Sequence, residues 1–225
     1  MRSLIAASLF AAVLSPSIAA AQGKWGLDVT AGTLGYGGGV GLALSESFNA
    51  RLYVAGLSYA RDFESSGVDY KARLQLRNAP LLLDWHVGGS LFRISAGVML
   101  NDDKLTVDAR PTAGATYTFN NVTYTSAQVG SATGVIKFNR AAPYIGFGFG
   151  RPIARHRGLS FAMDLGGAYL GKAKASLNVT CGAGVPANQC AQIQSDANAE
   201  AVQLGEDMKS YRWYPVIQAH LTYAF

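Results

Sequence analysis

The sequence is poor in charge, cysteine and histidine. Of its 225 residues only 15% are charged, two are cysteines and three are histidines, and the formal net charge is a modest +5. The excess of Lys and Arg does not indicate a nucleic-acid-binding protein, because no basic stretch is interleaved with exposed aromatic residues. Beyond the N-terminal region no stretch offers 18 uncharged apolar residues, so we expect no transmembrane helix.

The few candidate catalytic and ligand-binding groups do not form recognisable motifs. His86, His156 and His220 have no His-x-Ser pair near them and no spacing typical of a membrane-embedded hydrolase. Asn101-Asp102-Asp103 offers oxygen atoms but lacks the spacing of a calcium loop. The glycines of 35–41 lack the strand-turn-helix setting of a phosphate loop. We therefore expect no catalytic residue, no metal site and no cofactor.

What the sequence does contain is alternation, most clearly in its last segment, Tyr211 to Phe225. Odd-numbered positions there are apolar or aromatic, and even-numbered positions are mostly polar or small. Side chains of a strand point alternately to its two faces, so this segment predicts a ribbon with one apolar face. Aromatic residues mark both ends of that face, as in the girdles of membrane barrels, and the length suits a tilted strand of about 9–11 residues with its flanks.

The N-terminus predicts export. Arg2 precedes an apolar run from Leu4 to Leu14, and Ala19-Ala20-Ala21 provides small residues for cleavage before Gln22. The apolar run is too short to span a bilayer, which takes about 20 residues. We expect residues 1–21 to be a signal peptide and residues 22–225 to form one domain, an outer-membrane β-barrel.

The same alternation recurs along the chain and predicts an all-β fold, a closed antiparallel up-and-down transmembrane β-barrel. Single-chain bacterial barrels have an even number of strands, which gives eight strands if the first apolar region is a hairpin with its turn near Gly35–Gly39. The alternation changes phase near Pro80 and Pro143, where we expect β-bulges. The predicted strands cover about 24–33, 40–44, 50–61, 70–86, 92–109, 133–149, 159–179 and 211–225.

The charged residues within the predicted strands are expected to line the barrel. The interior of an eight-stranded barrel is only wide enough for side chains, and buried charges need partners. A static polar network that fills the lumen is therefore favoured over a narrow pore lined by cations. The expected interior polar network consists of Lys71, Arg73, Arg77, Asp84, Arg93, Asp164, Lys172, Lys174, Arg212, Gln218 and His220, with Arg51 or its neighbours.

Short and long connections alternate, which predicts the orientation. The turns at 45–49, 88–91 and 150–158 are expected in the periplasm, and the connections at 62–68, 110–132 and 181–210 outside the cell. Asn120-Asn121 predicts a hairpin within the second of these. In an exported chain Cys181 and Cys190 are expected to form a disulfide, and a short helix is expected from Ser195 or Asp196 to Met208.

The end of the chain resembles the C-terminal signal that the outer-membrane insertion machinery reads, with Phe225 preceded by Tyr223 and Leu221. The whole chain resembles the small, eight-stranded bacterial outer-membrane barrels of the OmpA-transmembrane-domain, OmpX and OmpW type. It is also similar to uncharacterised proteobacterial barrels with a short acidic helix and a Tyr-Pro step, as at Glu206-Asp207 and Tyr214-Pro215. The resemblance implies a monomer in the Gram-negative cell outer membrane, in contact with lipid and lipopolysaccharide.

Two functional hypotheses follow from the sequence. The first is a non-enzymatic integral outer-membrane protein, either with surface loops for contact or with a narrow, porin-like channel for small solutes. The second is a lipid-modifying outer-membrane enzyme with a site at the barrel rim. The sequence contains no catalytic motif that favours the second hypothesis.

Overall fold

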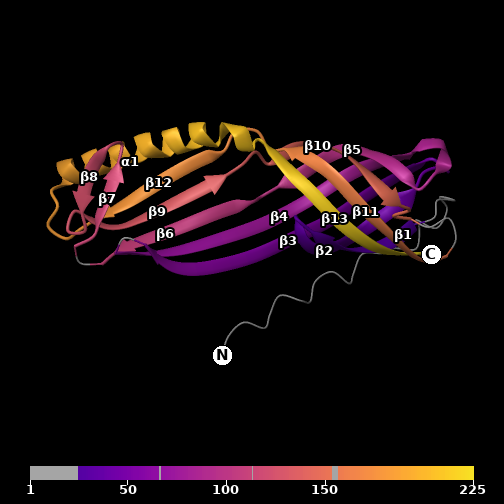
Figure 1. The fold of residues 1–225 in the computed structure, drawn as a ribbon, viewed down its shortest axis with the longest axis horizontal. Helices are drawn as coiled ribbons and strands as arrows, with labels where there is room; N and C mark the ends of the chain where they lie inside the picture. The colour runs from indigo at the N-terminus through magenta and orange to yellow at the C-terminus, as the bar shows by residue number, and fades with distance from the viewer. Residues whose placement is uncertain (1–24, 66, 113, 154–156) are drawn as a thin grey trace, which may run out of the picture.

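The computed structural model describes residues 25–65, 67–112, 114–153 and 157–225. The predicted signal peptide and His156 lie outside these residues. The described part is built from strands and one long helix (Figure 1). The strands are β1 (Trp25–Gly32), β2 (Gly35–Ala43), β3 (Phe48–Ser65), β4 (Val68–His86), β5 (Phe92–Asn101), β6 (Lys104–Pro111), β7 (Thr116–Phe119), β8 (Val122–Thr125), β9 (Val129–Lys137), β10 (Ala141–Gly150), β11 (Gly158–Tyr169), β12 (Lys174–Cys181) and β13 (Trp213–Ala224); the helices are α1 (Ala187–Asp207), η2 (Val87–Gly89) and η3 (Met208–Tyr211).

Eight of the strands form a closed ring in the order β4-β3-β2-β1-β13-β11-β10-β5. The ring closes because β1 pairs with β13 and β5 pairs with both β10 and β4, all in antiparallel register. Neighbouring strands in the ring leave no free edge between them. The predicted all-β antiparallel up-and-down sheet is confirmed.

The predicted strand count is wrong for the described residues, which form thirteen strands rather than eight. Breaks at 102–103, 138–140 and 170–173 divide three long ribbons, so β6, β9 and β12 continue β5, β10 and β11 beyond the ring. The remaining two strands, β7 and β8, form the hairpin expected around Asn120-Asn121. Both asparagines have positive φ values of 49° and 63°, as a tight two-residue hairpin turn requires.

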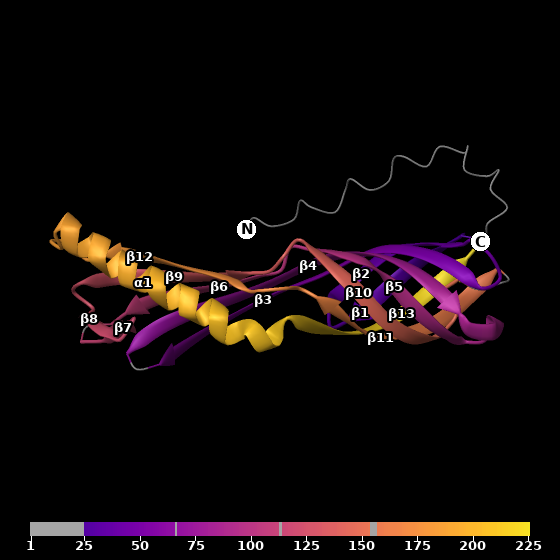
Figure 2. The same cartoon turned by 90° about the horizontal axis from the view of Figure 1, so that it is seen from above.

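Beyond the ring the sheet opens and becomes a lobe at one end of the elongated molecule (Figures 1 and 2). We define the lobe as β6, β9, β12, α1, the β7–β8 hairpin and the adjoining ends of β3 and β4, and call its end of the molecule the upper end. The lobe sheet has the order β3-β4-β6-β9-β12. Its core contains Val68, Ala109, Ala132, Val129, Tyr117, Phe119, Tyr124, Ile193 and Ala197.

The first hairpin turns earlier than predicted. The turn lies at Thr33-Leu34, and the glycines of 35–39 belong to β2 instead. Gly37 and Gly39 face the ring interior, where a Cβ atom on Gly39 would lie 2.4 Å from Cβ of Tyr53 and one on Gly37 would lie 1.8 Å from the Val54 carbonyl oxygen. These glycines are needed for the close approach of β3, not for a turn.

The expected change of phase at Pro80 is also wrong. Leu52 pairs with Leu81 and Ala55 with Asn78 in one continuous register, so β4 runs past Pro80 with its even-numbered residues still facing inward. Near Pro143 the outward residues likewise keep odd numbers from Lys137 to Phe149. The change lies in what covers each face. In the ring the outer face is apolar, and in the lobe the inner face is apolar because α1 and the hairpin cover it.

Helix α1 is longer than the predicted short helix. It begins at Ala187, after Pro186, and runs for 21 residues, with Ile193, Ala197 and Ala201 buried. Polar residues in its first two turns masked this start in the sequence. No described helix is both long and apolar enough to cross a membrane.

Candidate functional site

The lower half of the ring interior contains a cluster of buried ionised side chains. Two carboxylates, Asp84 and Asp164, are completely buried, as is Arg93, and Arg51 is only 4% exposed. These residues come from β3, β4, β5 and β11, whose inward-facing positions converge because the ring is narrow. Charges buried to this extent are stable only when they are paired.

The two arginines are paired with the two carboxylates. Arg51 donates to both oxygens of Asp84, from Nε at 2.6 Å and from Nη2 at 2.8 Å, and its Nη1 donates to Asp164 at 2.8 Å. Arg93 donates to the other oxygen of Asp164, and its Nη1 donates to the carbonyl of Gly150 at 2.8 Å. Ser95 donates its hydroxyl to Asp84. The network therefore joins strands on opposite sides of the ring.

His220 extends the cluster to β1. Its Nε2 lies 3.0 Å from Asp164 and its Nδ1 lies 3.0 Å from Asp28, which also accepts a hydrogen bond from Thr222. Both ring nitrogens thus face a carboxylate, an arrangement that an imidazolium satisfies because both of its nitrogens donate. With an imidazolium, three carboxylates face three cations and the cluster is electrically balanced.

A second layer of side chains closes the ring above the polar cluster. It is apolar and well buried, and it includes Leu34, Tyr53, Leu82, Met99, Tyr144 and Val216. Together with the ion pairs below it, this layer fills the cross-section of the ring with side chains. The arrangement matches a plug better than a water-filled channel.

The outer face of the ring is a continuous apolar band. Its side chains come from all eight ring strands, and among the described residues of this band none that points outward is charged. Leu81, Ile145 and Phe161 are 56%, 59% and 59% exposed. Aromatic residues lie near both margins of the band: Trp25, Phe48, Trp85, Phe149 and Phe225 at the lower one, and Tyr36, Tyr169 and Trp213 at the upper one.

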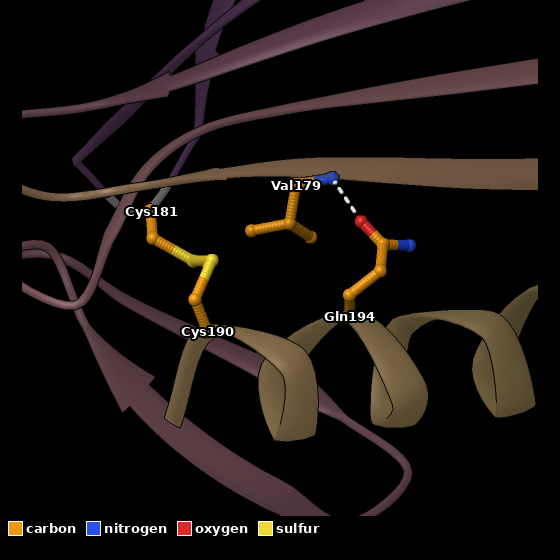
Figure 3. Close-up of a disulfide and its surroundings, with 4 residues drawn as sticks. All are labelled: Val179, Cys181, Cys190 and Gln194. Atoms are coloured by element: carbon orange, nitrogen blue, oxygen red, sulfur yellow. Dashed lines mark hydrogen bonds between the residues drawn. A yellow bond between two sulfur atoms is a disulfide. The ribbon is translucent and has the colours of Figure 1, made fainter. Parts of the chain in front are cut away.

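In the lobe, helix α1 is fixed to the sheet at several points. Cys181 at the end of β12 forms a disulfide with Cys190 in the first turn of α1 (Figure 3). Further along, the backbone N–H of Val179 donates to the side chain of Gln194 at 2.8 Å. The Gln194 amide in turn donates to the carbonyl of Leu177 at 2.7 Å. The disulfide and the Gln194 bridge together hold α1 along β12.

The helix is also tied to the β7–β8 hairpin through Asp196. Its buried carboxylate accepts hydrogen bonds from the Tyr124 hydroxyl, the Gln192 amide and the Asn120 amide. The bond from Tyr124, then the one from Gln192, lowers the pKa of Asp196 below its ordinary value, and the same Tyr124–Asp196 bond raises the pKa of Tyr124. In the hairpin itself, burial raises the pKa of Tyr117 to about 12.

The structure divides the predicted interior network into two groups. Asp84, Arg93, Asp164 and His220 lie together in the ring, and Arg212 lies at the upper rim, where its Nε is buried. Gln218 is also buried in the ring. The expected interior position of Lys172 and Lys174 is wrong, because both side chains are exposed, Lys174 at the start of β12 and Lys172 just before it. The expected interior position of Lys71, Arg73 and Arg77 is also wrong. These three are exposed on the outer face, because β4 keeps one register and its odd-numbered residues point outward throughout.

Two members of the polar cluster are not singled out by the sequence. Asp28 is not among the predicted interior residues, and Arg51 is predicted only together with its neighbours. Both lie at inward-facing positions of an alternating strand, which is the available signal. The residues of the predicted insertion signal, Leu221, Tyr223 and Phe225, lie on or after β13; their role in insertion stays a prediction.

The described residues contain no group of three His, Cys, Asp or Glu side chains that could hold a metal ion. His86 contacts Asn49 at 3.0 Å and the Ser90 carbonyl at 3.2 Å. His220 is enclosed by the polar cluster. Both histidines whose contacts are described therefore have partners that account for their positions.

Comparison with known proteins identifies the fold. No protein-family profile matches the chain, and no curated protein is significantly similar in sequence. The crystal structure of Acinetobacter baumannii CarO2 aligns with a TM-score of 0.57 at 20% identity, over 90% of this chain and 98% of that one. That of Acinetobacter baumannii CarO aligns with a TM-score of 0.56 at 21% identity, over 89% and 97%. A major outer membrane protein from Thermus thermophilus aligns more weakly, with a TM-score of 0.46 at 12% identity, over 91% and 100%.

Replacing one carboxylate of the polar cluster should destabilise the ring strongly. In Asp164→Asn, Arg51, Arg93 and His220 lose their shared counter-charge in a buried site, and we expect a loss of about 3–5 kcal/mol in the free energy of unfolding. The measurement is denaturant unfolding in neutral detergent micelles, followed by tryptophan fluorescence.

The matched control for Asp164→Asn is Asp62→Asn. Asp62 lies 3.8 Å from Lys71 on the outer face, and both side chains are largely exposed. We expect a loss below about 1 kcal/mol for the control. Equal losses for the two variants would contradict the assignment of the cluster as the main electrostatic tie of the ring.

Acid should loosen the hairpin from α1. The folded-state pKa of Asp196 is lower than that of the unfolded chain, so its stabilising contribution is complete above about pH 5 and is lost as the pH falls below about 4 toward the folded-state value. Hydrogen exchange at residues 116–125, corrected for the intrinsic pH effect, should be faster at pH 3 than at pH 6. In Asp196→Asn this difference should disappear; a difference that persists would contradict the role of Asp196.

Proposed function

We propose that this chain is a non-enzymatic integral protein of the bacterial outer membrane. In this proposal the ring crosses the membrane as an eight-stranded barrel, and the lobe stands on the extracellular side. The observation that carries the proposal is the inside-out distribution of polarity. The ring buries ion pairs in its lower interior and exposes a continuous apolar band outside, which is the reverse of a water-soluble sheet.

Closure of the ring supports the same conclusion. Backbone N–H and C=O groups have no water partners in hydrocarbon, so a sheet is compatible with the membrane only where every strand is paired on both sides. The eight ring strands meet this condition. The shared fold with the two Acinetobacter baumannii structures agrees with it, and the finer likeness to OmpA-, OmpX- or OmpW-type barrels is part of this proposal.

The role that fits this architecture best is that of a membrane anchor: the ring, closed by side chains and here called the plugged stalk, holds the lobe at the cell surface. The interior is filled by an apolar layer above a balanced set of ion pairs, so passage of solutes through the ring would require breaking several buried ion pairs. The lobe, by contrast, is held rigid by a disulfide and by the Asp196 contacts. Contact with other molecules outside the cell is the function that we assign to it.

Cysteine labelling tests the location and orientation. The described residues contain no free cysteine, so a single added cysteine can be read without background from them. Thr123→Cys, exposed in the hairpin, should react with a membrane-impermeant maleimide on intact cells. Glu46→Cys, exposed in the turn before β3 at the lower end, should react only after the outer membrane is permeabilised. Labelling of both on intact cells, or of neither, would contradict the proposal.

Conductance tests the plug. Protein that has been shown to insert into planar lipid bilayers should give no stable conductance steps in 1 M KCl, because the ring interior is filled by side chains. Insertion is checked on the same preparation by resistance of the ring strands to protease. Regular, reproducible steps from inserted protein would instead support a narrow channel and overturn the plugged-stalk role.

A further inference from the structure

The outer face changes abruptly from apolar to cationic at the upper rim of the ring. On β5 the last outward residue is Leu100, which is 58% exposed, and the next outward positions on that line are Asp102 and Lys104. We define two rows of cations at this boundary. The rim row is Arg77 and Arg140, and the lysine row, about 7 Å higher along the strands, is Lys104, Lys137 and Lys174.

The lysine row places three like charges side by side. Lys137 on β9 is the direct register partner of Lys104 on β6 and of Lys174 on β12. Adjacent strands are about 4.8 Å apart, and like charges directly opposite one another destabilise a sheet. Within the described part of the chain, no ion pair or hydrogen bond compensates any of these three ammonium groups.

Several charges higher on the same face are opposite a charge of the other sign. Four residues above Lys104 on β6, Asp108 is opposite Lys71 of the neighbouring strand β4, and two residues further on Arg110 is opposite Asp69. Lys71 also lies 3.8 Å from Asp62. Arg73, one outward position above the lysine row, is opposite Thr106 and Ala60. The excess of positive charge is therefore concentrated at and just above the boundary, and its position needs an explanation other than a generally basic lobe.

The boundary is also hollowed. A depression of about 630 Å³ is lined by the apolar Tyr36, Val54 and Leu100 and by both cations of the rim row, with Asp102 as its acidic residue. A second depression of about 510 Å³ is lined by the whole lysine row, together with Phe138, Asn139 and Ser176. Arg140 borders both depressions. Each therefore combines cationic groups with apolar surface.

We propose that these two rows, together the basic ledge, bind the phosphate groups of anionic lipids in the outer leaflet. The inference rests on the proposed function, because it is the membrane that brings lipid headgroups to this height. Arg and Lys are the usual protein partners of phosphate, and the apolar band below the ledge accommodates the acyl chains of the same molecules. A lipid-borne phosphate thus satisfies both the charge and the apolar surface, whereas a free anion satisfies only the charge.

The probe for the test is diphosphoryl lipid A, added to the full-length protein in neutral detergent micelles and counted by native mass spectrometry. The ledge variant Lys104→Gln/Lys137→Gln/Lys174→Gln should bind it about tenfold to a hundredfold more weakly than the wild type, since each cation near an anionic lipid surface adds a several-fold factor. Arg77→Gln/Arg140→Gln should weaken binding in the same direction.

The matched control removes two cations from the balanced part of the face, as many as the rim-row variant removes. Lys71→Gln/Arg110→Gln should bind within about twofold of the wild type, because these two residues lie opposite carboxylates above the ledge. Each variant should show the same difference in electrophoretic mobility between unheated and heated samples as the wild type, which shows that its ring is folded. Equal weakening by the control and ledge variants would mean nonspecific attraction and would overturn the proposal.

Two further experiments, one of competition and one of direct binding, identify the source of the phosphate. Inorganic phosphate at millimolar concentration should not displace the lipid, and dephosphorylated lipid A should bind no better to the wild type than to the ledge variant. Displacement by free phosphate, or tight wild-type binding of the dephosphorylated lipid, would contradict the lipid-phosphate ledge. These failures are distinct from failure of the proposed function, which is read from cysteine labelling on cells and does not involve the ledge residues.

Discussion

Closure of the ring is the constraint on which the rest of the structure depends. A strand with an unpaired edge is costly in hydrocarbon, and the pairing of β1 with β13 and of β4 with β5 removes that edge. Once closed, eight strands leave an interior just wide enough for side chains. That interior must then be filled without unpaired charges, which accounts for the joint presence of Arg51, Asp84 and Asp164 on different strands.

The lobe shows what happens where closure ends. Above the breaks at 102–103, 138–140 and 170–173 the ribbons continue, but β1 and β2 do not, so the sheet has free edges and an uncovered apolar face. Helix α1 and the β7–β8 hairpin cover that face, and the Cys181–Cys190 disulfide holds the helix against it. Polarity therefore reverses along a single strand such as β4. Its outer face is apolar in the ring and charged in the lobe, and the basic ledge lies where the two regimes meet.

The sequence predicts the orientation of a strand correctly where each face of that strand keeps the same environment along its whole length. The alternation predicted for Tyr211 to Phe225 is found in β13, because one apolar face of that strand meets one environment along its length. The prediction fails for Lys71, Arg73 and Arg77. Alternation shows that a strand has two different faces, but it does not show which face is covered. In β4 the covered inner face is apolar in the lobe and largely polar in the lower ring. The turn predicted at the glycines of 35–39 is wrong, because these glycines allow the close approach of Tyr53, a tertiary contact that the sequence does not reveal. The ledge was missed because it depends on the register between β6, β9 and β12.

Contact between the outer face of the ring and hydrocarbon can be tested with the three tryptophans of the chain. Trp25, Trp85 and Trp213 all lie on that face and are 40%, 45% and 57% exposed. The most direct measurement is quenching of their fluorescence in lipid vesicles, comparing lipids brominated on the acyl chains with aqueous acrylamide. If the outer face lies in the membrane, the brominated lipids should quench the fluorescence strongly and acrylamide should quench it little. Efficient quenching by acrylamide with no effect of the brominated chains would contradict this location.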